Sequence, residues 1–225
     1  MPEATVPIEL VESPEGSGAA IVLVHEIFGR SQYMRTRARD LAALGYTVAL
    51  PQLYWRIGAD AVDENGDDSL ERGVAMMRQV DWQQAVDDVR LVIASLRREP
   101  RTGGRVALVG FCFGGGLAYA ALQGAADGER ADALVSYYGS ALPNLVDGEA
   151  VTVPSLHHFG DADAYLTSDA VEHICEVVQH NGAEVKLWQG AGHAFDNPAP
   201  QFHHAQASDA AWEATVEWLR THYPA

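Results

Sequence analysis

The sequence has little cysteine and little positive charge. Its 225 residues include two cysteines, and 15 lysines and arginines stand against 31 aspartates and glutamates, for a net charge of −16. Two cysteines do not make a disulfide framework, which favours free thiols and a cytoplasmic protein. The negative charge argues against nucleic acid and anionic membranes as partners, because both bind a basic face.

Long apolar runs and a basic amino-terminal segment are also missing. The first residues, MPEATVPIEL, carry acids and do not have the pattern of a signal peptide. No apolar stretch approaches the roughly 20 residues of a membrane span. With 48% hydrophobic and 20% charged residues, the composition is that of a globular protein. We expect a single α/β domain over residues 1–225, as a monomer or homodimer.

Short apolar runs alternate with longer amphipathic segments along the chain. Strands are expected at Ala20–Val24, Thr47–Leu50, Arg105–Val109, Ala133–Tyr137, Val153–Phe159 and Val185–Trp188. Helices are expected at Tyr33–Leu44, Asp81–Arg98, Phe113–Leu122, Ser168–His180 and Ala207–Thr221. This alternation predicts a mostly parallel central sheet flanked by helices on both faces. Ligands bind such sheets at the carboxyl ends of the strands.

One segment departs from the alternation. Residues 58–73 contain six acids and show little periodicity: Asp60, Asp63, Glu64, Asp67, Asp68 and Glu71. Two interpretations stay open, a solvated surface excursion and a lid or rim over a pocket.

The stretch Gly110-Phe111-Cys112-Phe113-Gly114 follows an apolar strand and opens a helix. It matches the G-x-S-x-G nucleophile elbow, with cysteine in place of serine. A sulfur at the amino end of a helix is favoured as a thiolate, and the N–H of Phe113 points to where an oxyanion would form. Cys112 is therefore the predicted nucleophile. Cys175 lies in mid-helix without such a context and is interpreted as a structural thiol.

The acid and the base are expected after the nucleophile, in that order. Gly160-Asp161-Ala162-Asp163 follows a late strand, and the usual spacing selects Asp163 as the acid, with Asp161 as the alternative. His193 follows the next strand within a glycine-rich turn and is the predicted base.

Two histidine pairs raise the question of a metal. The pairs are His157-His158 and His203-His204. Adjacent histidines in a strand point to opposite faces, and no cysteine or carboxylate accompanies them at ligand spacing. We therefore predict no metal site.

The turn after the first predicted strand reads His25-Glu26-Ile27-Phe28-Gly29. In enzymes with this elbow, the second oxyanion N–H comes from this turn, and Ile27 is the candidate. A carboxylate at Glu26 would repel an oxyanion. Either Glu26 turns away into a salt bridge, or it partners the Cys112 thiol, holding it protonated at rest and accepting its proton when substrate arrives.

Taken together, these motifs resemble the dienelactone hydrolase (carboxymethylenebutenolidase) family of the α/β-hydrolase fold. The matching pieces run in family order over about residues 5–222: His25–Gly29, Pro51–Tyr54, Gly110–Gly115, Tyr137–Gly139, Gly160–Asp163 and Ala191–Phe195. The resemblance implies a Cys-His-Asp triad of Cys112, His193 and Asp163 that cleaves a small lactone or carboxylic ester through a thioester, with Glu26 tied to thiol activation. Alternatives are an acyltransferase or thioesterase on the same triad, or a non-catalytic ligand-binding relative.

The resemblance implies no metal and no organic cofactor, and it also bears on substrate binding. It places the pocket wall near Ile27, Tyr54, Phe113 and Phe195. Well-known members hold a substrate carboxylate with two arginines, but Leu70 and Asn197 stand at those places here. Only Arg72 lies near the first position, with Arg35 as a further candidate. We therefore expect a neutral substrate unless one of these arginines reaches the pocket.

Overall fold

The computed structural model describes residues 5–13 and 18–225. In chain order, its strands and longer helices are β1 Ile8–Val11, β2 Ala20–Val24, α1 Gln32–Ala43, β3 Thr47–Pro51, α2 Ser69–Met77, α3 Trp82–Arg97, β4 Val106–Phe111, α4 Phe113–Leu122, β5 Ala133–Tyr137, β6 Ser155–Gly160, α5 Ser168–His180, β7 Glu184–Trp188 and α6 Ala205–His222. Short 3₁₀ turns at Trp55–Ile57, Pro100–Thr102 and Leu142–Asn144 connect some of them.

The strands of the described residues form a seven-stranded sheet in the order β1-β3-β2-β4-β5-β6-β7. All neighbouring pairs are parallel except β1 with β3, which is antiparallel. Every residue of β2 to β6 is buried. Strands β2 and β4 read as continuous apolar runs because helices cover both of their faces, whereas β6 buries His157 and His158. The predicted α/β-hydrolase class, with its mostly parallel sheet, is confirmed.

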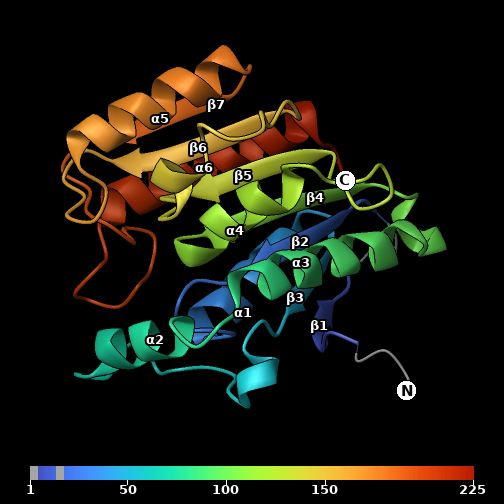
Figure 1. Cartoon of the computed structure of the whole chain (residues 1–225), viewed down its shortest axis with the longest axis horizontal. Coiled ribbons are helices and arrows are strands. Elements are labelled where there is room, and N and C mark those ends of the chain that lie inside the picture. The colour runs from blue at the N-terminus through green and yellow to red at the C-terminus, as the bar shows by residue number, and fades with distance from the viewer. Residues whose placement is uncertain (1–4, 14–17) are drawn as a thin grey trace.

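The helices form two layers around the sheet. Helices α3 and α4 pack together on one face, while α1 and α6 lie on the other (Figure 1). The sequence of α3 explains why it forms a surface helix. The Asp81 side chain caps its first turn, and its buried positions recur every three or four residues. None of the helices in the described part of the chain is long and apolar enough to cross a membrane.

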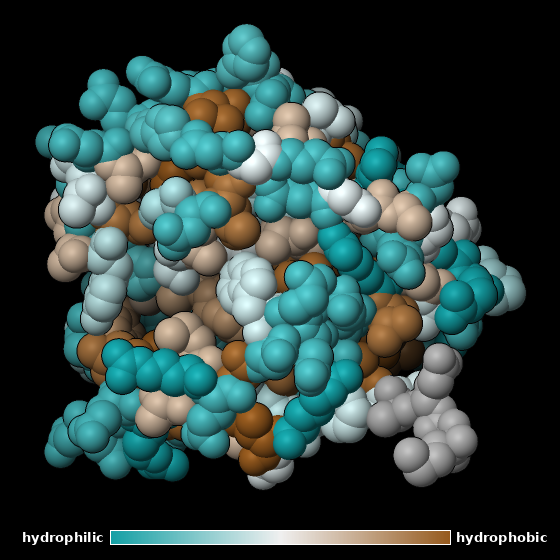
Figure 2. Space-filling model, in the orientation of Figure 1, coloured by the Kyte–Doolittle hydropathy of each residue, from teal (hydrophilic) through white to brown (hydrophobic). Residues whose placement is uncertain are grey.

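The expected strands and helices agree with the structure to within two residues at each end. Two elements were not predicted. Strand β1 is short and lies at the edge of the sheet, and helix α2 begins inside the acidic segment 58–73. Helix α2 lies beyond the carboxyl ends of the strands (Figure 1). In the same orientation the surface beside α2 is hollowed, with apolar surface in the recess (Figure 2).

Candidate active site

Cys112 lies between the end of β4 and the start of α4, in a strained backbone conformation. Its φ of 52° and ψ of −114° are uncommon for a residue other than glycine. The turn is so tight that a Cβ at Gly110 would come within 2.3 Å of the Gly114 carbonyl oxygen, and one at Gly114 within 2.2 Å of the Val24 carbonyl oxygen. The two flanking glycines are therefore a steric requirement of the elbow.

Three predicted residues lie in one hydrogen-bonded line. The Cys112 Sγ is 3.1 Å from His193 Nε2, and His193 Nδ1 is 2.7 Å from Asp163 Oδ2. The other Asp163 oxygen, Oδ1, accepts hydrogen bonds from the backbone N–H groups of Tyr165 and Leu166. The carboxylate thus orients the imidazole, and the imidazole reaches the sulfur, as a nucleophile–base–acid arrangement requires.

The electrostatics of this line favour an ion pair. Burial alone would raise the pKa of the Cys112 thiol, but the adjacent His193 outweighs it, and the pKa of the thiol is lowered. Burial likewise opposes a charge on His193, but the sulfur and Asp163 raise the pKa of its imidazole. Since the two shifts point in opposite directions, thiolate and imidazolium stabilise each other.

Besides His193, one backbone donor and one side-chain donor act on the sulfur. The N–H of Phe113, at the first turn of α4, contributes to the lowered pKa of Cys112, as does the hydroxyl of Ser140. Ile27 follows the end of β2 and lines the cavity that contains Cys112. The Tyr54 hydroxyl donates to the Ile27 carbonyl at 2.9 Å. This bond fixes the segment that carries the second predicted oxyanion donor.

Glu26 is buried beside this centre and turns to Asn197 rather than to the sulfur. Asn197 Nδ2 donates a hydrogen bond to Glu26 Oε1. The predicted direct pairing with the Cys112 thiol is therefore not formed, because the sulfur hydrogen bonds to His193. The alternative, a salt bridge, is not formed either, since the Asn197 amide is neutral.

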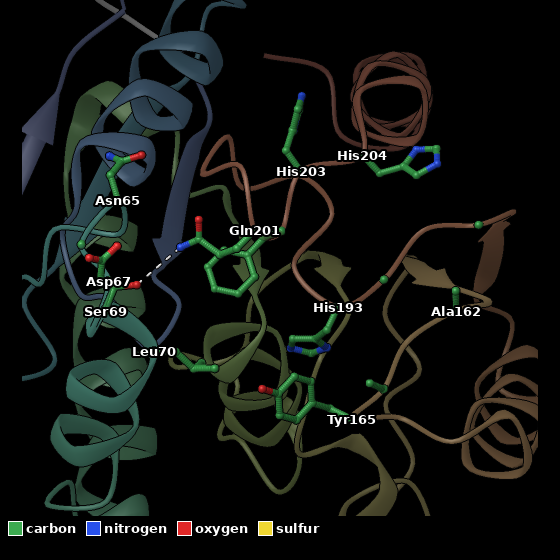
Figure 3. Close-up of a pocket in the computed structure, with 15 residues that line it drawn as sticks. Asn65, Asp67, Ser69, Leu70, Ala162, Tyr165, His193, Gln201, His203 and His204 are labelled. Atoms are coloured by element: carbon green, nitrogen blue, oxygen red, sulfur yellow. Dashed lines mark hydrogen bonds between the residues drawn. The ribbon is translucent and has the colours of Figure 1, made fainter.

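Two cavities meet at His193. The inner one, of about 130 Å³, is lined by Cys112 and by mainly apolar side chains: Ile27, Phe28, Leu70, Val74, Met77 and Phe202. The outer one, of about 730 Å³, is more polar, and its lining includes Asn65, Asp67, Gln201, His203 and His204. Figure 3 shows His193 and Tyr165 side by side, facing Leu70 of α2 across the outer cavity. Segment 65–70 thus forms part of the rim of this cavity.

The sequence model of the dienelactone hydrolase family matches residues 9–223. The chain belongs to the dienelactone hydrolase family. It is 31% identical over 211 residues to a carboxymethylenebutenolidase of Pseudomonas sp. (strain P51), covering 93% of this chain and 87% of the relative. It is 32% identical over 206 residues to carboxymethylenebutenolidase 1 of Cupriavidus pinatubonensis (strain JMP 134 / LMG 1197), covering 90% of this chain and 86% of that relative.

Solved structures agree on the fold. A putative dienelactone hydrolase from Klebsiella pneumoniae subsp. pneumoniae MGH 78578 superimposes with a TM-score of 0.74 at 23% identity, covering 95% of this chain and 92% of that one. A dienelactone hydrolase-like promiscuous phosphotriesterase from metagenomic libraries superimposes with a TM-score of 0.73 at 22% identity, covering 96% of this chain and 92% of that one. By its family, the chain is a dienelactone hydrolase-like enzyme that hydrolyses lactones or esters.

Three predicted substrate contacts of this hydrolase lie outside the linings of the two cavities. Tyr54 is fully buried beneath the β2 turn, where it donates to Ile27. Phe195 is fully buried against Tyr137 and Tyr138. Arg72 is exposed on α2 and its guanidinium faces Asp68 at 3.7 Å. Each side chain has packing or charge partners that hold it away from the cavities.

Leu70 and Asn197 stand where well-known members of the family have arginine. The two residues lie in different surroundings. Leu70 lines both cavities. Asn197 is fully buried and binds Glu26. Arg35 pairs with Glu9 at 2.9 Å instead of entering a cavity. No lysine or arginine of the described residues lines either cavity.

Ile27, which was expected at the pocket wall, lines the inner cavity, but the sequence interpretation missed most of the other apolar side chains of this wall. Val74 and Met77 come from α2, whose periodicity is hidden by the acids before it, and Phe202 comes from the long loop before α6. Phe28 also lines this cavity. It belongs to the matched motif after β2, and this motif was the one sequence signal for these wall residues.

The histidine pairs have separate environments. His157 and His158 are buried in β6, and burial lowers the pKa of each. His203 and His204 line the outer cavity, where His204 also caps α6. Within residues 5–13 and 18–225, no group of three or more histidine, cysteine or acidic side chains is arranged to hold a metal.

Proposed function

We propose that this member of the family hydrolyses a neutral carboxylic ester or lactone through a thioester on Cys112. The observation that carries the proposal is the hydrogen-bonded line from Cys112 Sγ through His193 to Asp163. The line ends at a cavity that is open to a small molecule and lined mainly by apolar side chains.

The first half-reaction forms the thioester. The Cys112 thiolate attacks the carbonyl carbon, and the N–H groups of Phe113 and Ile27 bind the oxyanion. When the tetrahedral intermediate collapses, the bond from carbon to the leaving oxygen breaks, and that oxygen takes the proton of the His193 imidazolium. The alcohol leaves, or stays attached if the substrate is a lactone, and the acyl group remains on the sulfur.

The second half-reaction releases the acid. Neutral His193, oriented by Asp163, accepts a proton from water as the water oxygen attacks the thioester carbon. The carbon–sulfur bond then breaks and the thiolate returns beside the imidazolium. One water is consumed for each ester bond cleaved, and the resting ion pair is restored.

The charge of the cavities supports a neutral substrate. The related enzymes named above are carboxymethylenebutenolidases, a name that denotes a lactone bearing a carboxyl group. Here Leu70 lines both cavities and no lysine or arginine of the described residues joins it. Burying an unpaired carboxylate among apolar side chains costs several kcal/mol.

A matched pair of activated esters tests this function. p-Nitrophenyl butyrate and mono-p-nitrophenyl succinate share a four-carbon acyl chain, and only the second carries a carboxylate. We expect kcat/KM to be more than about tenfold higher for the butyrate, because about 1.4 kcal/mol of lost binding is tenfold. Intact-protein mass spectrometry after acid quench should show a butyryl adduct on Cys112. Equal rates for the two esters would contradict the neutral-substrate preference, and turnover without a cysteine adduct would contradict the thioester.

The ion pair also predicts a pH profile. Activity needs the Cys112 thiolate, so kcat/KM should rise as pH increases through the lowered pKa of that thiol. It also needs the His193 imidazolium, so the rate should fall as pH exceeds the raised pKa of that ring. Ultraviolet absorbance of the thiolate, measured against a Cys112→Ala protein, locates the acidic limb independently. An acidic limb at or above the ordinary thiol value of 9.0 would contradict the ion pair.

A further inference from the structure

Glu26 is an unusual group for the inner cavity, whose other side chains are mostly apolar. Its side chain lines that cavity together with Cys112, yet the residue is only 1% exposed. Its backbone is held by two hydrogen bonds to its own carbonyl, from His25 Nδ1 and from the N–H of Gly29. The backbone of Glu26 is thus held in place, and its carboxyl group lies in the wall of the cavity that contains the reacting sulfur.

The partner of Glu26 is a neutral amide with a defined orientation. Asn197 Oδ1 accepts the N–H of Ala199 at 2.9 Å, which leaves Nδ2 to donate to Glu26 Oε1. Asn197 is fully buried. The amide therefore satisfies one carboxyl oxygen and supplies no positive charge.

Two groups around Glu26, the Asn197 amide and the His193 ring, favour its ionisation and lower its pKa. Burial, Cys112 and Glu64 act in the opposite direction. Tyr33, Tyr54 and Tyr138 also lie in its electrostatic surroundings. The His193 ring already faces the sulfur and Asp163. Arg37, a part-buried cation that lies over the Tyr33 ring, makes two hydrogen bonds with the Asp196 carboxylate. Burial, followed by the neighbouring Cys112, raises the pKa of Glu26 well above its ordinary value.

We propose that burial in the wall of the apolar inner cavity keeps Glu26 a neutral carboxylic acid, that Asn197 fixes its orientation, and that the Glu26 O–H donates a hydrogen bond to an oxygen of the substrate bound at Cys112. This inference rests on the hydrolysis proposed above. A neutral acid removes the repulsion that a carboxylate would exert on the oxyanion. It also excludes the role predicted from sequence, because a protonated carboxyl cannot accept the thiol proton. The His193 imidazole makes that acceptor unnecessary. A carboxylic acid kept neutral by an apolar site is an effective donor to developing negative charge.

Two substitutions at position 26 distinguish a Glu26 that donates a hydrogen bond to the substrate from a Glu26 that acts as a base. Glu26→Gln keeps the shape and supplies an N–H donor, so kcat/KM for p-nitrophenyl butyrate should stay within about tenfold of wild type. Glu26→Leu removes the donor and should lower kcat/KM by about 10²-fold or more, as loss of one oxyanion donor does. The acidic limb of the pH profile should be the same in wild type and Glu26→Gln. A Gln variant as slow as the Leu variant, or with a displaced acidic limb, would overturn the proposal in favour of a base.

Infrared difference spectroscopy tests the protonation state without turnover. At neutral pH the wild type should show the C=O stretch of a protonated carboxyl, shifted in D₂O and absent from Glu26→Gln. Glu64→Gln, which removes the other buried glutamate, is the matched control and should keep this band. If only carboxylate bands differ between wild type and Glu26→Gln, the neutral acid is wrong. Because this measurement needs no substrate, it stays informative even if no acyl adduct forms and the proposed hydrolysis fails.

Discussion

Cys112→Ala is expected to lower kcat/KM for p-nitrophenyl butyrate by about 10⁴-fold or more, because covalent catalysis is lost along with the nucleophile. Residual hydrolysis would come from the oxyanion donors and the cavity, which the substitution leaves in place. Stopped-assay product release over long incubations would measure the remaining rate, and circular dichroism would check that the fold is retained.

Cys175→Ala provides the matched control. Cys175 is half-buried in mid-helix on α5 and lines a different cavity, near Leu187 of the edge strand β7. Burial raises the pKa of its thiol, so it is a poor nucleophile at neutral pH. Its removal should leave kcat/KM close to wild type. If instead Cys112→Ala retained a substantial rate, or Cys175→Ala lost it, the elbow would not be the reacting site.

The part of the site that could be predicted from sequence is the part that local backbone geometry demands. Gly110 and Gly114 are needed because any side chain there collides with a neighbouring carbonyl, so the motif itself reports the turn. Asp163 and His193 follow buried strands of a parallel sheet, and the ends of such strands meet at one edge. The same logic located strands β2 and β4, whose continuous apolar runs reflect cover on both faces.

What could not be predicted depends on contacts between distant segments. Strand β1 is half-exposed and four residues long, so its sequence carries little pattern until it pairs with β3. The Asn197–Glu26 bond joins residues 171 positions apart. Likewise, Tyr54 and Phe195 have aromatic side chains suited to a pocket wall, but the structure buries them beneath it. Residue type and spacing do not determine which face of a loop meets the cavity.

Asp163→Asn is expected to lower kcat/KM by about 10⁴-fold, because the amide would stabilise the wrong tautomer of the base. Asp163 Oδ1 accepts two backbone hydrogen bonds, from the N–H groups of Tyr165 and Leu166 at 2.7 and 3.0 Å. An asparagine must keep its oxygen at that place and turn its NH₂ group toward His193 Nδ1. The ring would then carry its proton on Nε2, the nitrogen that faces the sulfur, where it can accept neither the Cys112 thiol proton before acylation nor a proton from water afterwards.

Asp161→Asn separates this effect from a general loss of loop order. Asp161 lies two residues earlier in the same turn, and its Oδ1 accepts the N–H of Gly190 at 2.6 Å. Asparagine can retain that bond, so Asp161→Asn should leave kcat/KM close to wild type in the same assay. The two variants remove the same charge at nearby positions, and only one of the two carboxylates touches the imidazole. If both variants lost activity equally, the cause would be the charge of the turn, and the tautomer argument for Asp163 would be wrong.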